Sequence, residues 1–191
     1  IPHVNKARDA FLNQELFWRR GVWDKYMFDG NLKTFFSVFH YTRDKRIDKG
    51  ALRLDFGKIE VVDAIKMRSL WPSAQTNQPP LQLSAELSED LKTWTSVTFK
   101  RGDKEGQTVK IAEITHNGGA HKLVDADLYS WTLQTEDSRK IRYVRVFEAP
   151  ERVAEFDAWN NRQKLDGSAW RATNLFAPFK AAAPDKAWQA S

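Results

Sequence analysis

The chain has 191 residues, which is long enough for one domain that buries its own core without metal or disulfide staples. It contains no cysteine, and this excludes a disulfide scaffold, a thiolate nucleophile and cysteine-ligated metal sites. The net charge of +5 comes from basic residues interleaved with acids, as in 43–48, which indicates a solvated surface and no nucleic-acid partner, and no apolar run is long enough for a membrane span.

The N-terminal residues 1–20 form either an extension or a first strand. Residues 4–20 fit a short amphipathic helix with Asn5 as a candidate N-cap, and they also fit an irregular strand. Because the chain begins with Ile1, we expect a processed or excised piece, with any signal peptide outside it.

Residues 21–160 are dominated by alternation of apolar and polar residues with a period of two, which is typical of half-buried strands. Leu52, Leu54 and Phe56, for example, alternate with Arg53 and Asp55. Strands are predicted at 52–56, 59–68, 81–87, 94–100, 109–115, 129–135, 141–147 and 153–159. Turns are predicted at 56–58, 88–90, 101–103 and 117–119. This spacing predicts an all-β sandwich or barrel.

Residues 161–191 lack the alternation and are predicted to be a tail or a linker to a further domain. The segment is rich in Ala, and it contains four large apolar residues that are poorly suited to a free linker in water: Trp170, Leu175, Phe176 and Phe179. We expect these side chains to cover part of the sandwich or a neighbouring domain.

Five segments, in the same order along the chain, resemble motifs of one family. They are FDGNLKTFF (28–36), ALRLDFG with its return IEVV (51–62), AELSEDLKTW (85–94), IRYVRV (141–146) and VAEF (153–156). Together they are similar to the discoidin or coagulation factor 5/8 C-type domain, the galactose-binding-like fold that includes family 32 carbohydrate-binding modules. The resemblance implies an eight-stranded jelly-roll β-sandwich over 21–160.

The resemblance also implies a structural calcium ion where the first long loop meets the last strand. Carried over residue by residue, its ligands are Asp29, Asn31, Thr34 and Glu155. Calcium prefers hard oxygen ligands, and an Asp-Gly-Asn turn exposes several of them within a short distance. The alternative is an ordinary turn and an unrelated surface carboxylate.

For the sugar-binding edge, the resemblance implies His40, Tyr41, Trp71 and Asn77 as ligand contacts. Aromatic rings stack on the apolar faces of sugars, and polar groups match their hydroxyls. Trp71 is predicted to lie in a loop, because Pro72 makes burial in a sheet unfavourable. Core packing is the alternative for Trp71, and a half-buried strand end is the alternative for His40.

Two departures from the family bear on its function. The motif YTPR, which supplies an arginine to galactose, is absent, although Arg68 lies nearby, and the loop 149–152 carries no aromatic residue. One interpretation is a non-catalytic, calcium-containing carbohydrate-binding module. It would belong to a larger secreted or cell-surface bacterial protein, such as a glycan-degrading enzyme, with a glycan and neighbouring domains as partners. The other is a structural or protein-interaction module of the same fold that has lost sugar binding.

An enzyme is not predicted. Acidic residues are close together in 151–157 and at Asp125 and Asp127, but no pattern places two carboxylates across a cleft, as glycoside hydrolysis requires. No nucleophile elbow, phosphate loop or metalloprotease helix is present in the sequence. The expected location is extracellular, periplasmic or at the cell surface.

Overall fold

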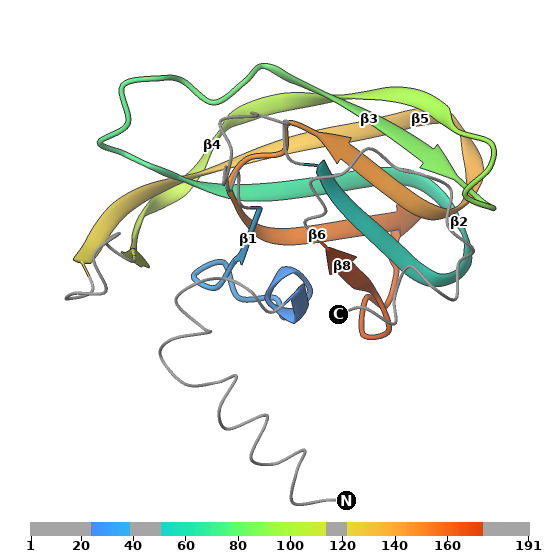
Figure 1. The fold of residues 1–191 in the computed structure, drawn as a ribbon, viewed down its shortest axis with the longest axis horizontal. Helices are drawn as coiled ribbons and strands as arrows, with labels where there is room; N and C mark the ends of the chain where they lie inside the picture. The colour runs from blue at the N-terminus through green and yellow to red at the C-terminus, as the bar shows by residue number, and fades with distance from the viewer. Residues whose placement is uncertain (1–23, 39–50, 114–121, 174–191) are drawn as a thin grey trace, which may run out of the picture.

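The computed structural model describes residues 24–38, 51–113 and 122–173, and these residues form an all-β structure (Figure 1). The elements are η1 (Asp24–Met27), β1 (Phe36–Ser37), β2 (Ala51–Pro72), β3 (Gln82–Ser88), β4 (Thr95–Glu113), β5 (Lys122–Phe147), β6 (Arg152–Asn160), β7 (Gln163–Lys164) and β8 (Arg171–Thr173). The predicted all-β, jelly-roll-like sandwich is confirmed. Within the described ranges, no helix has the length and apolar character to cross a membrane.

The strands form two layers because the three longest strands pass from one layer to the other (Figure 1). We call layer A the antiparallel set of β1, β6, β2 from 64 to 72, β5 from 126 to 134 and the second part of β4. Layer B contains β8, β2 from 53 to 55, β5 from 143 to 147, β3 and the first part of β4. Long strands shared in this way make both layers parts of one hydrogen-bonded sheet.

Bulges let the long strands bend between the layers. In β2 the register shifts between Asp55 and Glu60, and Gly57 adopts a φ of 78°, while its amide donates a 2.7 Å hydrogen bond to Asp55 Oδ1. The turn predicted at 56–58 is therefore wrong. The glycine does supply the left-handed conformation of a turn, but the chain bends there without reversing. The turn predicted at 101–103 is wrong for the same reason, because it lies at a register shift inside β4.

The core between the layers is built by the alternation that the sequence displays. In β2, Ile65 and Met67 point into the core, whereas the intervening Lys66 and the following Arg68 are only partly buried. Met67 pairs with Trp131 of β5 on one side and with Phe156 of β6 on the other, and all three side chains are buried. Layer A is thus fixed in register by large inward side chains.

The C-terminal described residues are part of the sandwich. β7 pairs with β6 and β8 pairs with β2, so the hydrogen-bonded structure continues to Thr173. Trp170 is 1% exposed, stacks on Phe56 with ring centroids 4.4 Å apart, and meets Phe28 edge-on at 5.8 Å. Trp170 therefore lies in the core of this domain. Leu175, Phe176 and Phe179 lie outside the described residues.

Candidate functional site

A compact turn at 29–34 gathers oxygen atoms at one corner of layer A. Gly30 has a φ of 72°, the amide of Asn31 donates to Asp29 Oδ1 over 2.8 Å, and the amide of Lys33 donates to Asn31 Oδ1 over 3.1 Å. The hydroxyl of Thr34 lies 2.7 Å from Asp29 Oδ2 and 2.8 Å from the carbonyl oxygen of Asn31. A carboxylate, a hydroxyl and a backbone carbonyl are thus held close together.

Glu155 of β6 contributes a buried carboxylate to this corner. Its side chain is 3% exposed, and Oε2 has no hydrogen-bond partner. Burial in the first place, and then the negative charges of Asp157 and Asp29, raise the pKa of Glu155 to about 7, although the positive charges of Lys164 and Arg68 partly offset this rise. Asp29 is therefore close enough to Glu155 for their charges to interact. We call Asp29, Asn31, Thr34 and Glu155 the oxygen corner.

Asp157, two residues further along β6, has the opposite environment. Its carboxylate is also buried, but it forms ion pairs with Arg68 at 2.6 Å and with Lys164 at 2.5 Å. Arg68 is bound on its other side to Glu105 at 3.1 Å. The guanidinium group of Arg68 therefore takes part in a network of ion pairs with Asp157 and Glu105.

The oxygen corner has the chemistry of a hard-cation site. Its donors are two carboxylates, an amide oxygen, a hydroxyl and a backbone carbonyl, with no nitrogen or sulfur, as calcium prefers. In the described part of the chain, no three His, Asp or Glu side chains converge into a metal-binding group. A cation here would need the mixed donor set and water. The unpartnered Oε2 of Glu155 fits such an ion, since a buried carboxylate without a partner is costly.

A separate groove opens at the end of layer A. It has a volume of about 380 Å³ and lies between the end of β2, the loop that follows β2, and the loop that joins β5 to β6. We call it the Trp71 groove; its lining residues are Leu70, Trp71, Gln75, Asn77, Pro80, Glu148, Ala149, Pro150, Glu151 and Arg152. Its size falls within the range of small-molecule sites.

Trp71 forms one side of this groove. Its ring is half-buried, and its Nε1 donates a 3.1 Å hydrogen bond to the carbonyl oxygen of Asn77, which fixes the ring against the loop. Trp71 lies within β2, so its predicted loop position is wrong. Pro72, the last residue of β2, is buried and pairs with Ala126. A strand can end on proline because its last residue need not donate to the ladder.

The loop that joins β5 to β6 forms a second wall of the groove, although none of its residues was predicted as a ligand contact. It consists of Glu148, Ala149, Pro150, Glu151 and Arg152, and Arg152 Nη1 lies 3.1 Å from Glu151 Oε2. The one local signal of an unusual chain path is the φ of 52° at Glu148. With Gln75 and Asn77, this wall brings amide, carboxylate and guanidinium groups to the lining of the groove, beside the apolar Ala149 and Pro150.

The structure places the predicted ligand residues as follows. Trp71 and Asn77 lie together in one groove, joined by a hydrogen bond. His40 and Tyr41 lie outside the described residues. Of the four predicted calcium ligands, Asp29, Asn31 and Thr34 are joined by hydrogen bonds within one turn, and Glu155 of β6 is within range of the charge of Asp29.

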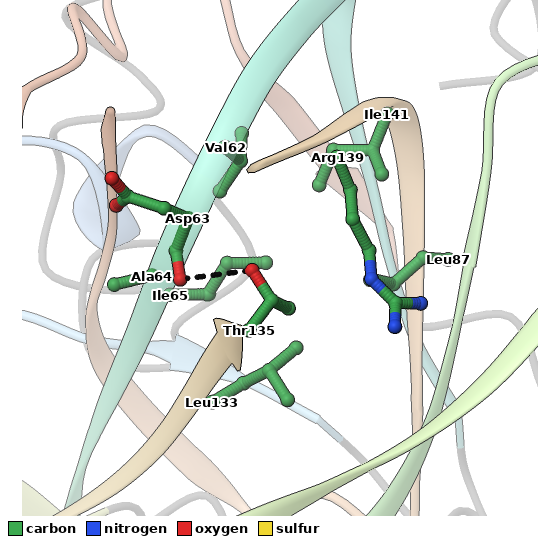
Figure 2. Close-up of a pocket in the computed structure, with 9 residues that line it drawn as sticks. All are labelled: Val62, Asp63, Ala64, Ile65, Leu87, Leu133, Thr135, Arg139 and Ile141. Atoms are coloured by element: carbon green, nitrogen blue, oxygen red, sulfur yellow. Dashed lines mark hydrogen bonds between the residues drawn. The ribbon is translucent and has the colours of Figure 1, made fainter. Parts of the chain in front are cut away.

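A second hollow, shown in Figure 2, is not a binding site. It lies where β5 leaves β2, around the 3.1 Å hydrogen bond from Thr135 Oγ1 to the carbonyl oxygen of Asp63. Its volume is about 10 Å³, which is at most the space of one water molecule. Apolar side chains such as Ile65, Leu133 and Ile141 supply most of its lining.

No protein-family model and no curated protein matches the chain. A solved structure that is similar to it is CBM32-1 from a family 31 glycoside hydrolase from Clostridium perfringens. The similarity covers 72% of this chain and 84% of that chain, with 15% sequence identity and a TM-score of 0.43. At this level of identity and superposition, it carries no conclusion about what this chain binds.

Proposed function

We propose that this chain is a non-catalytic carbohydrate-binding module that holds a glycan in the Trp71 groove. The observation that carries the proposal is the half-buried indole of Trp71 in the lining of a groove of about 380 Å³, where apolar side chains are accompanied by several polar groups. One face of a sugar ring is apolar enough to stack on an indole, while its hydroxyls need donors and acceptors around the edge. Gln75, Asn77, Glu151 and Arg152 supply both kinds.

We further propose that the oxygen corner binds a structural calcium ion. Asp29, Asn31, Thr34 and Glu155 would hold it, and its charge would offset the burial of the Glu155 carboxylate. The ion would fasten the loop at 29–34 to β6, so that two distant parts of the chain are joined. Its role in this proposal is to stabilise the fold and not to catalyse a reaction.

The biological context follows from the expected weakness of such a site. One aromatic ring and a few hydrogen bonds support a low affinity, which becomes useful when several modules or an attached enzyme act together. We therefore propose an accessory role in a larger secreted or cell-surface bacterial protein, such as a glycan-degrading enzyme. The sequence and size of the full gene product test this context directly.

A glycan array on the chain, followed by isothermal titration of the glycans retained, tests the binding proposal. We expect retention of particular neutral glycans by the wild type and its loss in Trp71→Ala. Trp94→Ala is the matched control, because Trp94 is also half-buried but packs under Arg145 outside the groove, with 4.1 Å between the guanidinium and the ring. This control should bind as the wild type does.

The alternative is a structural or protein-interaction module of the same fold. The groove wall at 148–152 carries no aromatic residue, so a sugar would stack on Trp71 alone. An empty array for a folded wild-type chain would favour this alternative. Binding that survives Trp71→Ala would show that glycan is held elsewhere.

A further inference from the structure

We propose that calcium at the oxygen corner orders the wall of the Trp71 groove at 148–152, and that calcium and glycan therefore bind cooperatively. This inference rests on the proposed function. It extends that function because the two sites, which lie on different loops, are joined by a short path of described contacts. The path has a backbone part and a side-chain part.

The backbone part of the path is β1. Thr34 of the oxygen corner is followed by Phe35 and then by β1, whose two residues pair with Val153 and Arg152 at the start of β6. One residue further, the amide of Val38 donates a 2.7 Å hydrogen bond to the carbonyl oxygen of Glu151. Arg152 and Glu151 line the groove, so β1, which follows the loop at 29–34, is hydrogen-bonded directly to the groove wall.

The side-chain part of the path is Phe35. This ring is buried in an apolar cluster that also contains Leu70 and Ala154. Leu70 lines the groove, and Ala154 is the neighbour of Glu155 in β6. A shift of the loop at 29–34 would therefore displace Phe35 and, through it, Leu70 in the lining of the groove, in addition to the wall at 148–152.

Ala149 and Pro150 of the wall are buried, and hydrogen bonds from two strands hold the end of the wall at Glu151 and Arg152. From β2, the hydroxyl of Ser69 donates a 2.6 Å hydrogen bond to the carbonyl oxygen of Arg152, at the register shift between Arg68 and Ser69. On the other side, β1 has only two residues. A two-residue strand opens easily unless the segment before it is held in place. A cation bound to Thr34 and Glu155 would hold that segment.

The thermodynamic consequence is reciprocal coupling. If calcium has already ordered the wall, a glycan that needs the ordered wall loses less entropy on binding. By linkage, a bound glycan must then tighten calcium binding by the same factor.

Amide hydrogen exchange of the full chain in calcium or in EGTA tests the link without any sugar. We expect the amides of Val38, Glu148, Ala149 and 151–153 to exchange at least about 5-fold more slowly in calcium than in EGTA, which is the lower end of typical coupling between sites. The amides of β3, in layer B, report any change in global stability. Slowed exchange confined to 29–34 and 154–157 would overturn the proposal, and so would the absence of calcium binding.

Two variants separate the path from general stabilisation. Phe35→Leu should still bind calcium but lose most of the calcium-dependent protection at 148–153. Ser69→Ala is the control. It should speed amide exchange at the wall both in calcium and in EGTA, and should keep the difference in exchange rate between these two conditions. If Phe35→Leu keeps full protection, the side-chain part of the path is wrong, and the wild-type comparison still decides the proposal as a whole.

Calorimetry with galactose, N-acetylgalactosamine and N-acetylglucosamine completes the test. The affinity for a bound sugar should rise in calcium by the factor by which that sugar raises calcium affinity. Equal sugar affinities in calcium and EGTA would overturn the cooperativity. An ordered wall with none of the three sugars bound would support the link from calcium to the wall, and would count against the glycan proposal alone.

Discussion

Two carboxylates of β6, spaced two residues apart, have opposite environments. Asp157 is matched by Arg68 and Lys164, whereas Oε2 of Glu155 is buried without a hydrogen-bond partner. Burial of an unpaired charge is unfavourable, and the raised pKa of Glu155 expresses that cost. Asp157 can therefore serve as the control for Glu155. Asp157 stabilises the metal-free fold through its ion pairs, whereas Glu155 is suited to bind a cation.

The pKa of Glu155 predicts how the stability of the metal-free chain changes with pH. The pKa is raised from 4.5 to about 7, so the folded state holds its proton more tightly than the unfolded state does. The free energy of unfolding should therefore fall as pH rises from about 4.5 to about 7, by about 3 kcal/mol in total. Below about pH 4.5, Glu155 is protonated in both the folded and the unfolded state, so it no longer makes the free energy of unfolding depend on pH.

Urea unfolding in EGTA, wild type against Glu155→Gln, measures this effect. The difference between the two proteins isolates Glu155 from the charged groups that face it, which are Asp157, Lys164, Asp29 and Arg68. We expect a wild-type disadvantage that appears between about pH 4.5 and about pH 7. A difference independent of pH would contradict the assignment.

Glu155→Gln and Asp157→Asn should differ in calcium as well. Glu155→Gln should remain folded and lose the increase in melting temperature that calcium gives the wild type. Asp157→Asn removes the ion pairs with Arg68 and Lys164, and should cost about 1–3 kcal/mol of unfolding free energy while retaining a calcium response, because Arg68 keeps Glu105 and Lys164 is half exposed. Melting curves in calcium and EGTA measure both effects. An undiminished calcium response in Glu155→Gln would contradict the role of the oxygen corner.

At the scale of elements, the closing segment before β8 is held by a single large ring. Trp170 lies between Phe56, Phe28 and Phe156, and its neighbours are fastened to η1: Asp24 Oδ2 accepts 2.8 Å hydrogen bonds from the amide of Ala172 and from Arg171 Nε. The start and the end of the described domain are thereby joined.

Trp170→Ala should therefore cost about 3–5 kcal/mol of unfolding free energy, the usual loss for a fully buried aromatic ring. Trp71→Ala, in which a half-buried ring is removed from a groove, should cost clearly less while affecting glycan binding. Urea denaturation of both variants makes the comparison. Equal losses would mean that Trp71 also serves the core.

The elements could be predicted from the sequence to the extent that their signals are local. Alternation in 52–56 and 81–87 predicted strands where β2 and β3 lie, with Leu83, Ala85 and Leu87 buried, although Leu81 lies before β3 and is exposed. Gly57 could not be interpreted correctly, because a glycine between two alternating runs is the same signal for a turn and for a bulge. Only the pairing of β2 with β5 on both sides of Gly57 decides between them.

The candidate site was predictable in part for the same reason. Trp71 and Asn77 are close in sequence and meet in one groove. Glu148, Glu151 and Arg152 reach that groove only through the pairing of β6 with β2, which has no local signature. The oxygen corner was found through its resemblance to a family, because no spacing rule links the turn at 29–34 to Glu155.

At the scale of the whole molecule, three long strands make both layers one continuous sheet. Both candidate sites lie at layer A, beside β6: the oxygen corner includes Glu155, and the groove ends at Arg152. One short strand, β6, thus carries residues of both the oxygen corner and the Trp71 groove, three positions apart.

The most direct test of the account is to follow the indole N–H signals of the eight tryptophans by NMR during titration with neutral sugars at millimolar concentration. Assignment uses Trp71→Phe and Trp94→Phe. The account predicts that the Trp71 signal shifts progressively with sugar, because the ring is fixed in the groove by its hydrogen bond to Asn77, while the Trp94 signal stays unchanged. A Trp71 signal that remains still while another indole shifts would contradict it.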